Sequence, residues 1–393
     1  MKKNTQKKRQ QKTARSMMAF SVLSAAVLSI TTATAANLFN RDTNPPTTGG
    51  GLCDSSDLMA VPQNPAEAGP WTVGSKTVQI GNLTTEVFYP AAAGTEVGKE
   101  LKQWDVRQFM PAGEAAKIPD EAAMKTCKTC YPDLPIDSTH GKYPVLIYVH
   151  GTAATRIYSL PFFEHWASRG FVVISADNPG ITQKDIMESF RNLLKADQKG
   201  DTQKLIREVN TLSASSPLAF LRGHIDANRI GLSGHSAGGV AVNALGSESG
   251  VRVIIPMASG GTKEGSQIKS TLVLGGLEDN TATFSVTTRA YESSPKPRRL
   301  VGFAGMGHVG FVDVCRGAEL RQQYGLEFSP AMNQLLSDGC GPQFLDVEKG
   351  WEMINYVSTA TFEETLMCSD SSADSLKAFP SRYGSQNVYK EAL

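Results

Sequence analysis

The 393-residue sequence lacks any apolar run long enough to cross a membrane. Its best candidate, residues 17–30, has 14 largely apolar residues, whereas a membrane-spanning helix needs about 20. Seven basic residues precede this run and Ala33-Thr34-Ala35 follows it, which is the pattern of a cleavable export signal. We therefore predict a signal peptide over residues 1–35, a secreted or periplasmic mature protein, and no stable membrane span.

The chain also lacks a strong net charge: its formal charge is +1. All seven charges in residues 1–35 are positive, so the remaining 358 residues carry −6. A chain of that sign is a poor match for a phosphate backbone, which excludes nucleic acid as an expected partner. Hydrophobic residues make up 40% of the chain, enough for a buried core, and no pattern indicates an oligomeric state.

Histidine is scarce, with six residues in the whole chain. No two of them stand at the spacing of metal ligands, and no Gly-x-Gly-x-x-Gly fingerprint stands out. We therefore expect neither a metal nor an organic cofactor.

Six cysteines are present, an even number that favours disulfides in an oxidising compartment. Nearness in sequence favours pairing Cys127 with Cys130 and Cys315 with Cys340, while Cys53 and Cys368 remain. A redox or zinc motif at Cys127–Cys130 is the weaker interpretation. It lacks a second ligand pair, and it does not open a helix after a strand.

The distribution of residue types predicts the domain organisation. Gly, Pro, Asn and Thr dominate residues 36–68, which indicates a flexible leader. From Gly69 onward, apolar runs such as 145–149 alternate with stretches able to form helices, for example residues 185–196. Residues 77–89 are expected to form one strand. The alternation predicts a single α/β domain over residues 69–393, a mostly parallel central sheet flanked by helices on both faces.

Two stretches do not fit this alternation, about residues 94–140 and about residues 311–347. Each contains a pair of cysteines. Insertions at the carboxyl edge of such a sheet commonly build the substrate pocket, so these are candidates for lid or rim elements. The alternative, that they only decorate the surface, stays open.

The sharpest motif is Gly234-His235-Ser236-Ala237-Gly238, which follows an apolar strand and opens a helix of small residues. In a Gly-x-Ser-x-Gly turn between strand and helix, a Cβ in place of either glycine would collide with backbone. The serine oxygen stands exposed above the sheet. The pentapeptide alone is a weak signal in a chain with 36 glycines, but the strand before it and the helix after it make it specific. It predicts Ser236 as a nucleophile.

The acid and the histidine follow the nucleophile in that order in this type of fold. His308 is the only histidine after Ser236 and lies in a small-residue loop beyond the last predicted strand, so we predict it as general base. Glu278 and Asp279 directly follow another strand. Asp279 is the preferred orienting acid because its short side chain suits a tight turn, and Glu278 is the alternative.

The developing oxyanion requires two backbone N–H donors. The first is predicted at Ala237, at the start of the helix, and the second at Thr152, in the glycine-containing loop after the strand 143–149. His150, in the same loop, is expected to be structural. These parts predict attack of Ser236 on an ester carbonyl, an acyl-enzyme, and its hydrolysis by water.

These residues resemble the α/β-hydrolase superfamily, in particular the predicted dienelactone hydrolases, which are similar to platelet-activating-factor acetylhydrolase and to bacterial cutinase-like polyester hydrolases. The resemblance covers about residues 69–310, in segments 69–74, 87–91, 143–151, 167–174 and 225–231 and in the serine motif. It implies ester hydrolysis by a Ser-Asp-His triad in an enzyme without a large helical cap.

The sequence departs from these relatives in two places. True dienelactone hydrolases use a cysteine where this chain has Ser236, and cutinase-type enzymes have an aromatic residue where it has Thr152. The insertions fit neither group. The resemblance therefore predicts a secreted serine carboxylesterase acting on short-chain or polymeric, cutin-like or polyester-like esters. Acetylhydrolase-like or lipase-like action on lipid esters, and a catalytically silent fold used for binding, are the alternatives.

Overall fold

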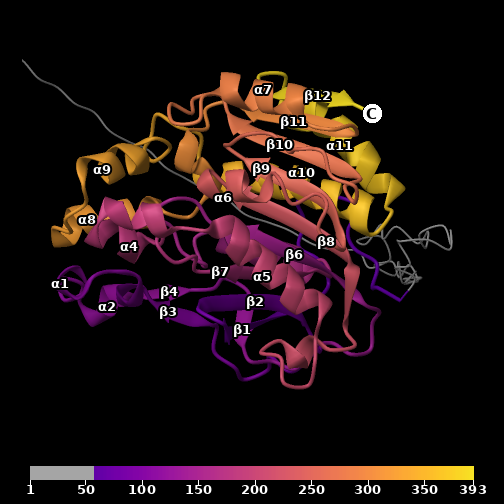
Figure 1. Ribbon diagram of the computed structural model, residues 1–393, viewed down its shortest axis with the longest axis horizontal. Coiled ribbons are helices and arrows are strands. Elements are labelled where there is room, and N and C mark those ends of the chain that lie inside the picture. The colour runs from indigo at the N-terminus through magenta and orange to yellow at the C-terminus, as the bar shows by residue number, and fades with distance from the viewer. Residues whose placement is uncertain (1–56) are drawn as a thin grey trace, which may run out of the picture. The chain divides into compact units, whose positions relative to one another are not determined.

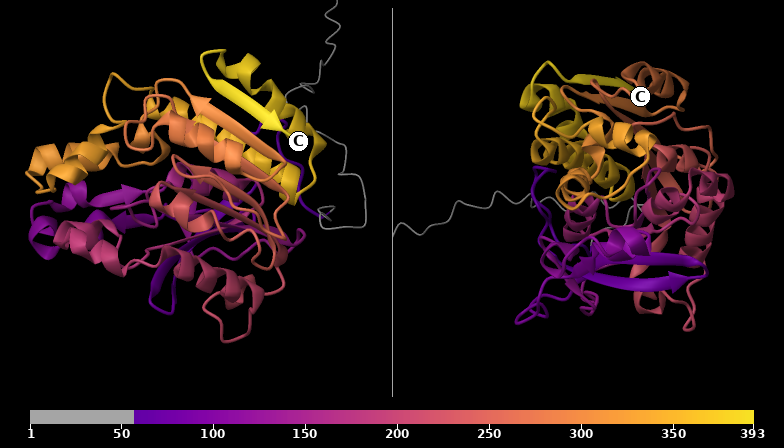
Figure 2. Two further views of the ribbon diagram at one scale, coloured as in Figure 1. Left: turned by 45° about the horizontal axis from the view of Figure 1, so that its top comes forward. Right: turned by 90° about the vertical axis from the view of Figure 1, so that its left-hand side faces the viewer.

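A ten-stranded sheet organises the computed structural model, which describes residues 57–393. Its order is β12-β11-β10-β9-β8-β6-β7-β2-β1-β5. The central strands pair in parallel: β6 (Tyr143–Val149), β7 (Val172–Ala176), β8 (Ile225–His235), β9 (Val251–Met257), β10 (Ser270–Gly276) and β11 (Arg298–Phe303). The flanking strands are β1 (Thr72–Ile80), β2 (Leu83–Ala91), β5 (Cys130–Pro132) and β12 (Val388–Ala392). Figure 2 shows β12 beside the last helix, α11 (Asp370–Tyr383). The predicted mostly parallel sheet is confirmed. The expected signal peptide and Cys53 lie outside the described residues.

Helices cover both faces of the sheet (Figure 1). One face carries α3 (Leu160–Ser168), α10 (Val347–Leu366) and α11 (Asp370–Tyr383), and the other carries α5 (Gln198–Asn210), α6 (Ala237–Val242) and α7 (Phe284–Ser293). Within β6, Leu146 and Tyr148 pack into the first layer, while Val145 and Ile147 pack into the second. A strand buried on both sides must be apolar at every position, which explains its unbroken hydrophobic run. No helix of residues 57–393 has both the length and the apolar character to span a membrane.

Two of the predicted elements are broken. Residues 77–89 do not form one strand, because Gly81 (φ +59°) and Asn82 make the two-residue turn that joins β1 to β2. The predicted helix 185–196 divides at Ser189 into α4 (Gln183–Glu188) and the 3₁₀ helix η2 (Phe190–Lys195). Ser189 is extended (φ −167°), and its hydroxyl accepts a hydrogen bond from the N–H of Arg191, so it caps a new turn.

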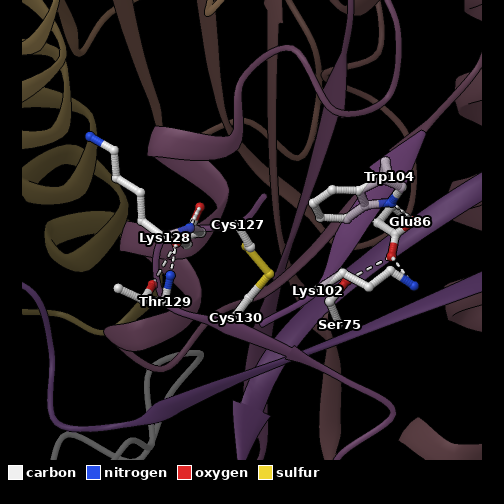
Figure 3. The surroundings of a disulfide bond; sticks show 9 residues. Ser75, Glu86, Lys102, Trp104, Cys127, Lys128, Thr129 and Cys130 are labelled. Atoms are coloured by element: carbon white, nitrogen blue, oxygen red, sulfur yellow. Dashed lines mark hydrogen bonds and ion pairs between the residues drawn. A yellow bond between two sulfur atoms is a disulfide. The ribbon is translucent and has the colours of Figure 1, made fainter. Parts of the chain in front are cut away.

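The first insertion contains short elements and a disulfide. The elements are β3 (Gln103–Asp105), η1 (Val106–Phe109), α1 (Ala112–Ala115), α2 (Asp120–Ala123), β4 (Met124–Thr126) and β5. Cys127 and Cys130 are bonded as predicted, and both are buried (Figure 3). The N–H groups of Lys128 and Thr129 between them donate to the carboxylate of Glu164 on α3, at 3.1 and 2.5 Å. The disulfide is therefore a cross-link inside the packed structure.

The second insertion forms α8 (Cys315–Tyr324) and α9 (Pro330–Ser337). The predicted disulfide between Cys315 and Cys340 is confirmed, and Cys368 is also disulfide-bonded. Leu320 of α8 shares a small apolar cluster with Ile118 of the first insertion, and α8 and α1 lie at the same end of the molecule, on the left in Figure 1. The two insertions therefore support each other.

Arg169 binds the described end of the predicted flexible leader to the sheet domain. Its guanidinium donates to the carbonyl oxygens of Pro62, Asn64 and Glu67, and its Nε donates to Glu363 Oε1 at 2.7 Å. Three carbonyl groups of the segment expected to be a flexible leader therefore help to replace the water that this buried cation has lost.

We expect Glu363→Gln to lower the free energy of unfolding by about 3 kcal/mol, because the fully buried Arg169 would lose its counter-charge. Urea unfolding followed by tryptophan fluorescence measures the change. Glu348→Gln is the control. It breaks the exposed ion pair with Lys128, and we expect less than about 1 kcal/mol from it. Equal losses from both variants would contradict the assigned role of Arg169.

Candidate active site

Ser236 occupies a sharp turn between β8 and α6. Its backbone is strained, with φ +53° and ψ −119°, and its N–H donates to the carbonyl oxygen of Met257 at 2.9 Å. A non-glycine residue in this conformation is held by its surroundings. Here the pairing of β8 with β9 and the start of α6 fix both sides of the turn.

The glycines around Ser236 are required by close backbone contact. A Cβ at Gly234 would lie 2.5 Å from the carbonyl carbon and oxygen of Gly238, and a Cβ at Gly238 would lie 2.0 Å from the carbonyl oxygen of Val149. A side chain at either glycine would therefore collide with backbone, as the Gly-x-Ser-x-Gly motif predicts.

His308 lies in the first turn of η4 (His308–Phe311), beyond β11, and its ring bridges two oxygen atoms. Its Nε2 is 3.0 Å from Ser236 Oγ, and its Nδ1 is 2.9 Å from Asp279 Oδ2. With the proton on Nδ1, the ring donates to the carboxylate and accepts from the serine hydroxyl. The structure thus brings together the three residues predicted as base, nucleophile and acid.

Asp279 is buried in the loop after β10, and its second oxygen is also occupied. Asp279 Oδ1 accepts from the N–H groups of Thr281 and Ala282, at 2.8 and 2.6 Å. The side chain of Glu278, the alternative acid, is exposed, and the hydrogen bonds of this residue are made by its backbone: its N–H donates to the carbonyl oxygen of Met306, and its carbonyl oxygen accepts from the side-chain amide of Asn280. The geometry therefore favours Asp279 over Glu278.

One predicted oxyanion donor lines the pocket that contains Ser236, and the other directly follows Ser236 in the chain. Thr152 lies on the pocket wall, and Ala237 is the first residue of α6, where a backbone N–H has no intrahelical acceptor. Within residues 57–393, neither N–H donates a hydrogen bond, whereas the N–H groups of Ala153 and Ala154 are bonded to Ile181 and Gly151. Two free donors beside a serine hydroxyl suit a developing negative charge.

Two further histidines are buried near this point and serve to hold the loops. His150 donates from Nδ1 to the carbonyl oxygen of Gly151 and accepts at Nε2 from the N–H of Asn178. His235 donates from Nε2 to the carbonyl oxygen of His308, at 2.9 Å. Burial lowers the pKa of both rings, which keeps them neutral. Neither bonds to Ser236, in line with the structural role expected for His150.

A small, mainly apolar pocket opens at Ser236, with a volume of about 30 Å³ available to the centre of a water molecule. Its wall comes largely from the second insertion and from η4, through six apolar side chains: Val309, Val312, Val314, Met332, Leu335 and Leu336. Of the two roles considered for the 311–347 insertion, rim of the pocket and surface decoration, the structure shows the first. No residue of the 94–140 insertion lines the pocket.

Gln183 is a polar residue in the pocket wall that was not predicted from the sequence. Its Oε1 accepts from the hydroxyl of Tyr158, while its buried Nε2 has no hydrogen-bond partner within the described structure. It begins α4 directly after the capping residue Thr182. The S/T-x-x-D pattern of that cap could have located the helix start, but nothing local points from Gln183 to Ser236.

The parallel sheet, the serine turn after β8 and the histidine after β11 define an α/β-hydrolase type of fold. The sequence model of the Chlorophyllase family, a family of α/β-hydrolase esterases, matches residues 134–254, less than a third of the chain. This match indicates a carboxylic ester hydrolase. No curated protein matches the chain.

The matched segment includes Ser236 and Thr152 but ends before Asp279 and His308. The narrower resemblance to dienelactone hydrolases, platelet-activating-factor acetylhydrolase and cutinase-like enzymes stays a prediction. No cluster of three or more His, Cys, Asp or Glu side chains suited to a metal ion occurs in residues 57–393.

A fluorophosphonate probe tests the chemistry of the three residues, because it reacts only with an activated serine. We expect Asp279→Asn to slow labelling of Ser236 by on the order of 10⁴-fold, since the amide favours the wrong tautomer of His308. Glu278→Gln is the matched control and should label at the wild-type rate. The assignment of the acid is wrong if the two variants exchange these behaviours. Labelling rates are measured by mass spectrometry of the intact protein.

Proposed function

We propose that the chain is an exported serine hydrolase that cleaves carboxylic esters through Ser236, His308 and Asp279. The observation that carries the proposal is the His308 ring, which is within hydrogen-bond distance of both Ser236 Oγ and Asp279 Oδ2. The coarse esterase assignment of the family match supports it independently, since the match ends before two of these three residues.

The proposed reaction has two stages, acylation of Ser236 and hydrolysis of the acyl-enzyme. His308 Nε2 accepts the hydroxyl proton of Ser236 as its oxygen attacks the ester carbonyl, and Asp279 stabilises the resulting imidazolium. The N–H groups of Thr152 and Ala237 hold the oxyanion. The imidazolium then protonates the departing alcohol, and a water molecule repeats the cycle on the acyl-enzyme, which releases the acid and restores Ser236.

The pocket favours a short apolar group on the substrate. Leu335 and Leu336 of α9 stand over the same space as Ser236, so the wall limits the chain that fits beside the nucleophile. Thr152 offers no aromatic ring against which a polymer could lie. We therefore place short-chain esters ahead of the polymeric and lipid esters that the resemblance also suggests.

Export is supported by three observations. Residues 1–35 have the pattern of a signal peptide, and two disulfides join cysteines of the described chain. Cys368 is also oxidised. Disulfides persist in oxidising compartments, so we propose that the mature protein acts outside the cytoplasm.

A series of p-nitrophenyl esters from acetate to palmitate tests the proposal. We expect kcat/KM to be highest for short acyl chains and to fall steeply for long ones, and Ser236→Ala to lose at least about 10³-fold in kcat. A preference for long chains would indicate lipid esters. Absence of turnover in the wild type would favour a binding role, and full turnover by Ser236→Ala would refute the mechanism.

Shortening the α9 wall should widen the acyl specificity. We expect Leu336→Ala to raise kcat/KM for the octanoate relative to the butyrate by roughly tenfold, since each buried methylene contributes about 1–3 kcal/mol to discrimination. Leu194→Ala removes an exposed leucine outside the pocket and should leave the ratio unchanged. The ratio is read from the same p-nitrophenyl assay. An unchanged ratio in Leu336→Ala would mean that the acyl chain does not contact α9.

A further inference from the structure

Asp338, which follows α9, is a buried carboxylate that the proposed chemistry does not use. Only 6% of its surface is exposed. Within the described part of the chain, no Lys, Arg or His nitrogen lies within ion-pair distance of it. Burying a charge without a counter-ion is unfavourable unless hydrogen bonds replace the lost water. The partners that replace water here all belong to the loop that follows Asp279.

The carboxylates of Asp338 and Asp279 accept hydrogen bonds from successive backbone N–H groups of this loop. Asp338 Oδ2 accepts from the N–H of Asn280 at 3.0 Å and from the hydroxyl of Thr281 at 2.7 Å. Asp279 Oδ1 accepts from the next two N–H groups, those of Thr281 and Ala282. Thr281 therefore bonds to both carboxylates, and a shift of the loop away from Asp338 would move the donors that orient Asp279.

The backbone of Asp338 also contacts the segment that carries His308. Its carbonyl oxygen accepts from the N–H of Val309 at 2.8 Å. The two segments are so close that a Cβ at Gly307 would lie 2.8 Å from the Cα of Gly339, and a Cβ at Gly339 would lie 2.8 Å from the N of Gly310. Asp338 is thus hydrogen-bonded to the residues that follow Asp279 in one loop and to the residue that follows His308 in the other.

We propose, on the basis of the proposed function, that Asp338 is a positioning residue that holds the loop after Asp279 and the first turn of η4 at the separation their hydrogen bond requires. It does not touch the reacting atoms. It acts through Thr281 and Val309. Leu335 and Leu336, in the last turn of α9, line the pocket, and Asp338 directly follows that turn. The same segment therefore forms part of the pocket wall and holds the loops of the triad.

The test compares Asp338→Ala, Asp338→Asn and Thr281→Val on p-nitrophenyl butyrate. We expect Asp338→Ala to lower kcat by roughly 10–100-fold, with KM changed less than about twofold, because small displacements of catalytic groups are expensive in rate. Asp338→Asn keeps an acceptor oxygen and should recover part of the loss. Thr281→Val should lower kcat by a few fold. The double variant should be no slower than Asp338→Ala alone, since both act through one contact.

Asp137→Asn separates this role from a loss of stability. Asp137 is equally buried and accepts hydrogen bonds from Trp71, Thr139 and Tyr143, at the opposite end of β6 from Ser236. The Asp137→Asn variant should have a lower melting temperature than the wild type and an unchanged kcat. If Asp338→Ala does not fold, the near-isosteric Asp338→Asn and Thr281→Val decide the question.

The outcomes distinguish the inference from the function on which it rests. Two results would overturn the positioning role alone, provided that turnover still depends on Ser236. The first is a wild-type kcat in the Asp338 variants. The second is a double variant in which the losses of kcat from Asp338→Ala and Thr281→Val multiply. A wild-type protein without Ser236-dependent turnover would overturn the proposed function as well.

Discussion

The close approach of three backbone segments beneath Ser236 is the constraint on which the candidate site depends. The turn after β8 passes within contact distance of the end of β6 and of its own helix, and Gly234 and Gly238 leave no room there for a side chain. The backbone of Ser236 is strained as a result, and the parallel pairing of β8 with both neighbours holds it in place. Every other group is placed relative to this fixed hydroxyl. His308 and Asp279 reach it from loops at the carboxyl ends of β11 and β10, because parallel strands bring those ends to one edge.

The second insertion combines two tasks that usually belong to different parts of such a fold. One side of α9 supplies the apolar wall of the pocket, and the residue after its last turn bonds to the loops of Asp279 and His308. The Cys315–Cys340 disulfide joins the start of α8 to the end of this segment, and the first insertion packs behind it. A mutation in this wall therefore has two physical routes to an effect on rate, through substrate contact and through loop position.

Local patterns were sufficient to predict the elements that meet at the site. The unbroken apolar run of β6 and the glycines around Ser236 are each visible within a few residues, because sheet burial and turn sterics act locally. Asp279 and His308, which lie 43 and 72 residues after Ser236, were predicted from their order along the chain and from their positions after predicted strands. The fold class and both disulfide pairs among the described cysteines followed from such signals.

The rest could not be predicted in this way, because it arises from contacts between distant segments. Asp338 and Gln183 have unremarkable neighbours in sequence, and α8 and α9 are short helices placed by a disulfide and by packing. The hydrogen bonds of Arg169 to the carbonyl groups of Pro62 and Glu67, in the expected leader, join residues about a hundred positions apart in sequence.

The Cys127–Cys130 and Cys315–Cys340 disulfides differ in their access to solvent. Cys127 and Cys130 are buried, and the carboxylate of Glu164 binds the backbone between them, whereas Cys315 and Cys340 are partly exposed. Thiol exchange requires an attacking thiolate to reach a sulfur atom in line. A small reductant would therefore open the outer bond while the inner one persists. The sheet domain would keep its inner cross-link, and the helices that shape the pocket would lose theirs.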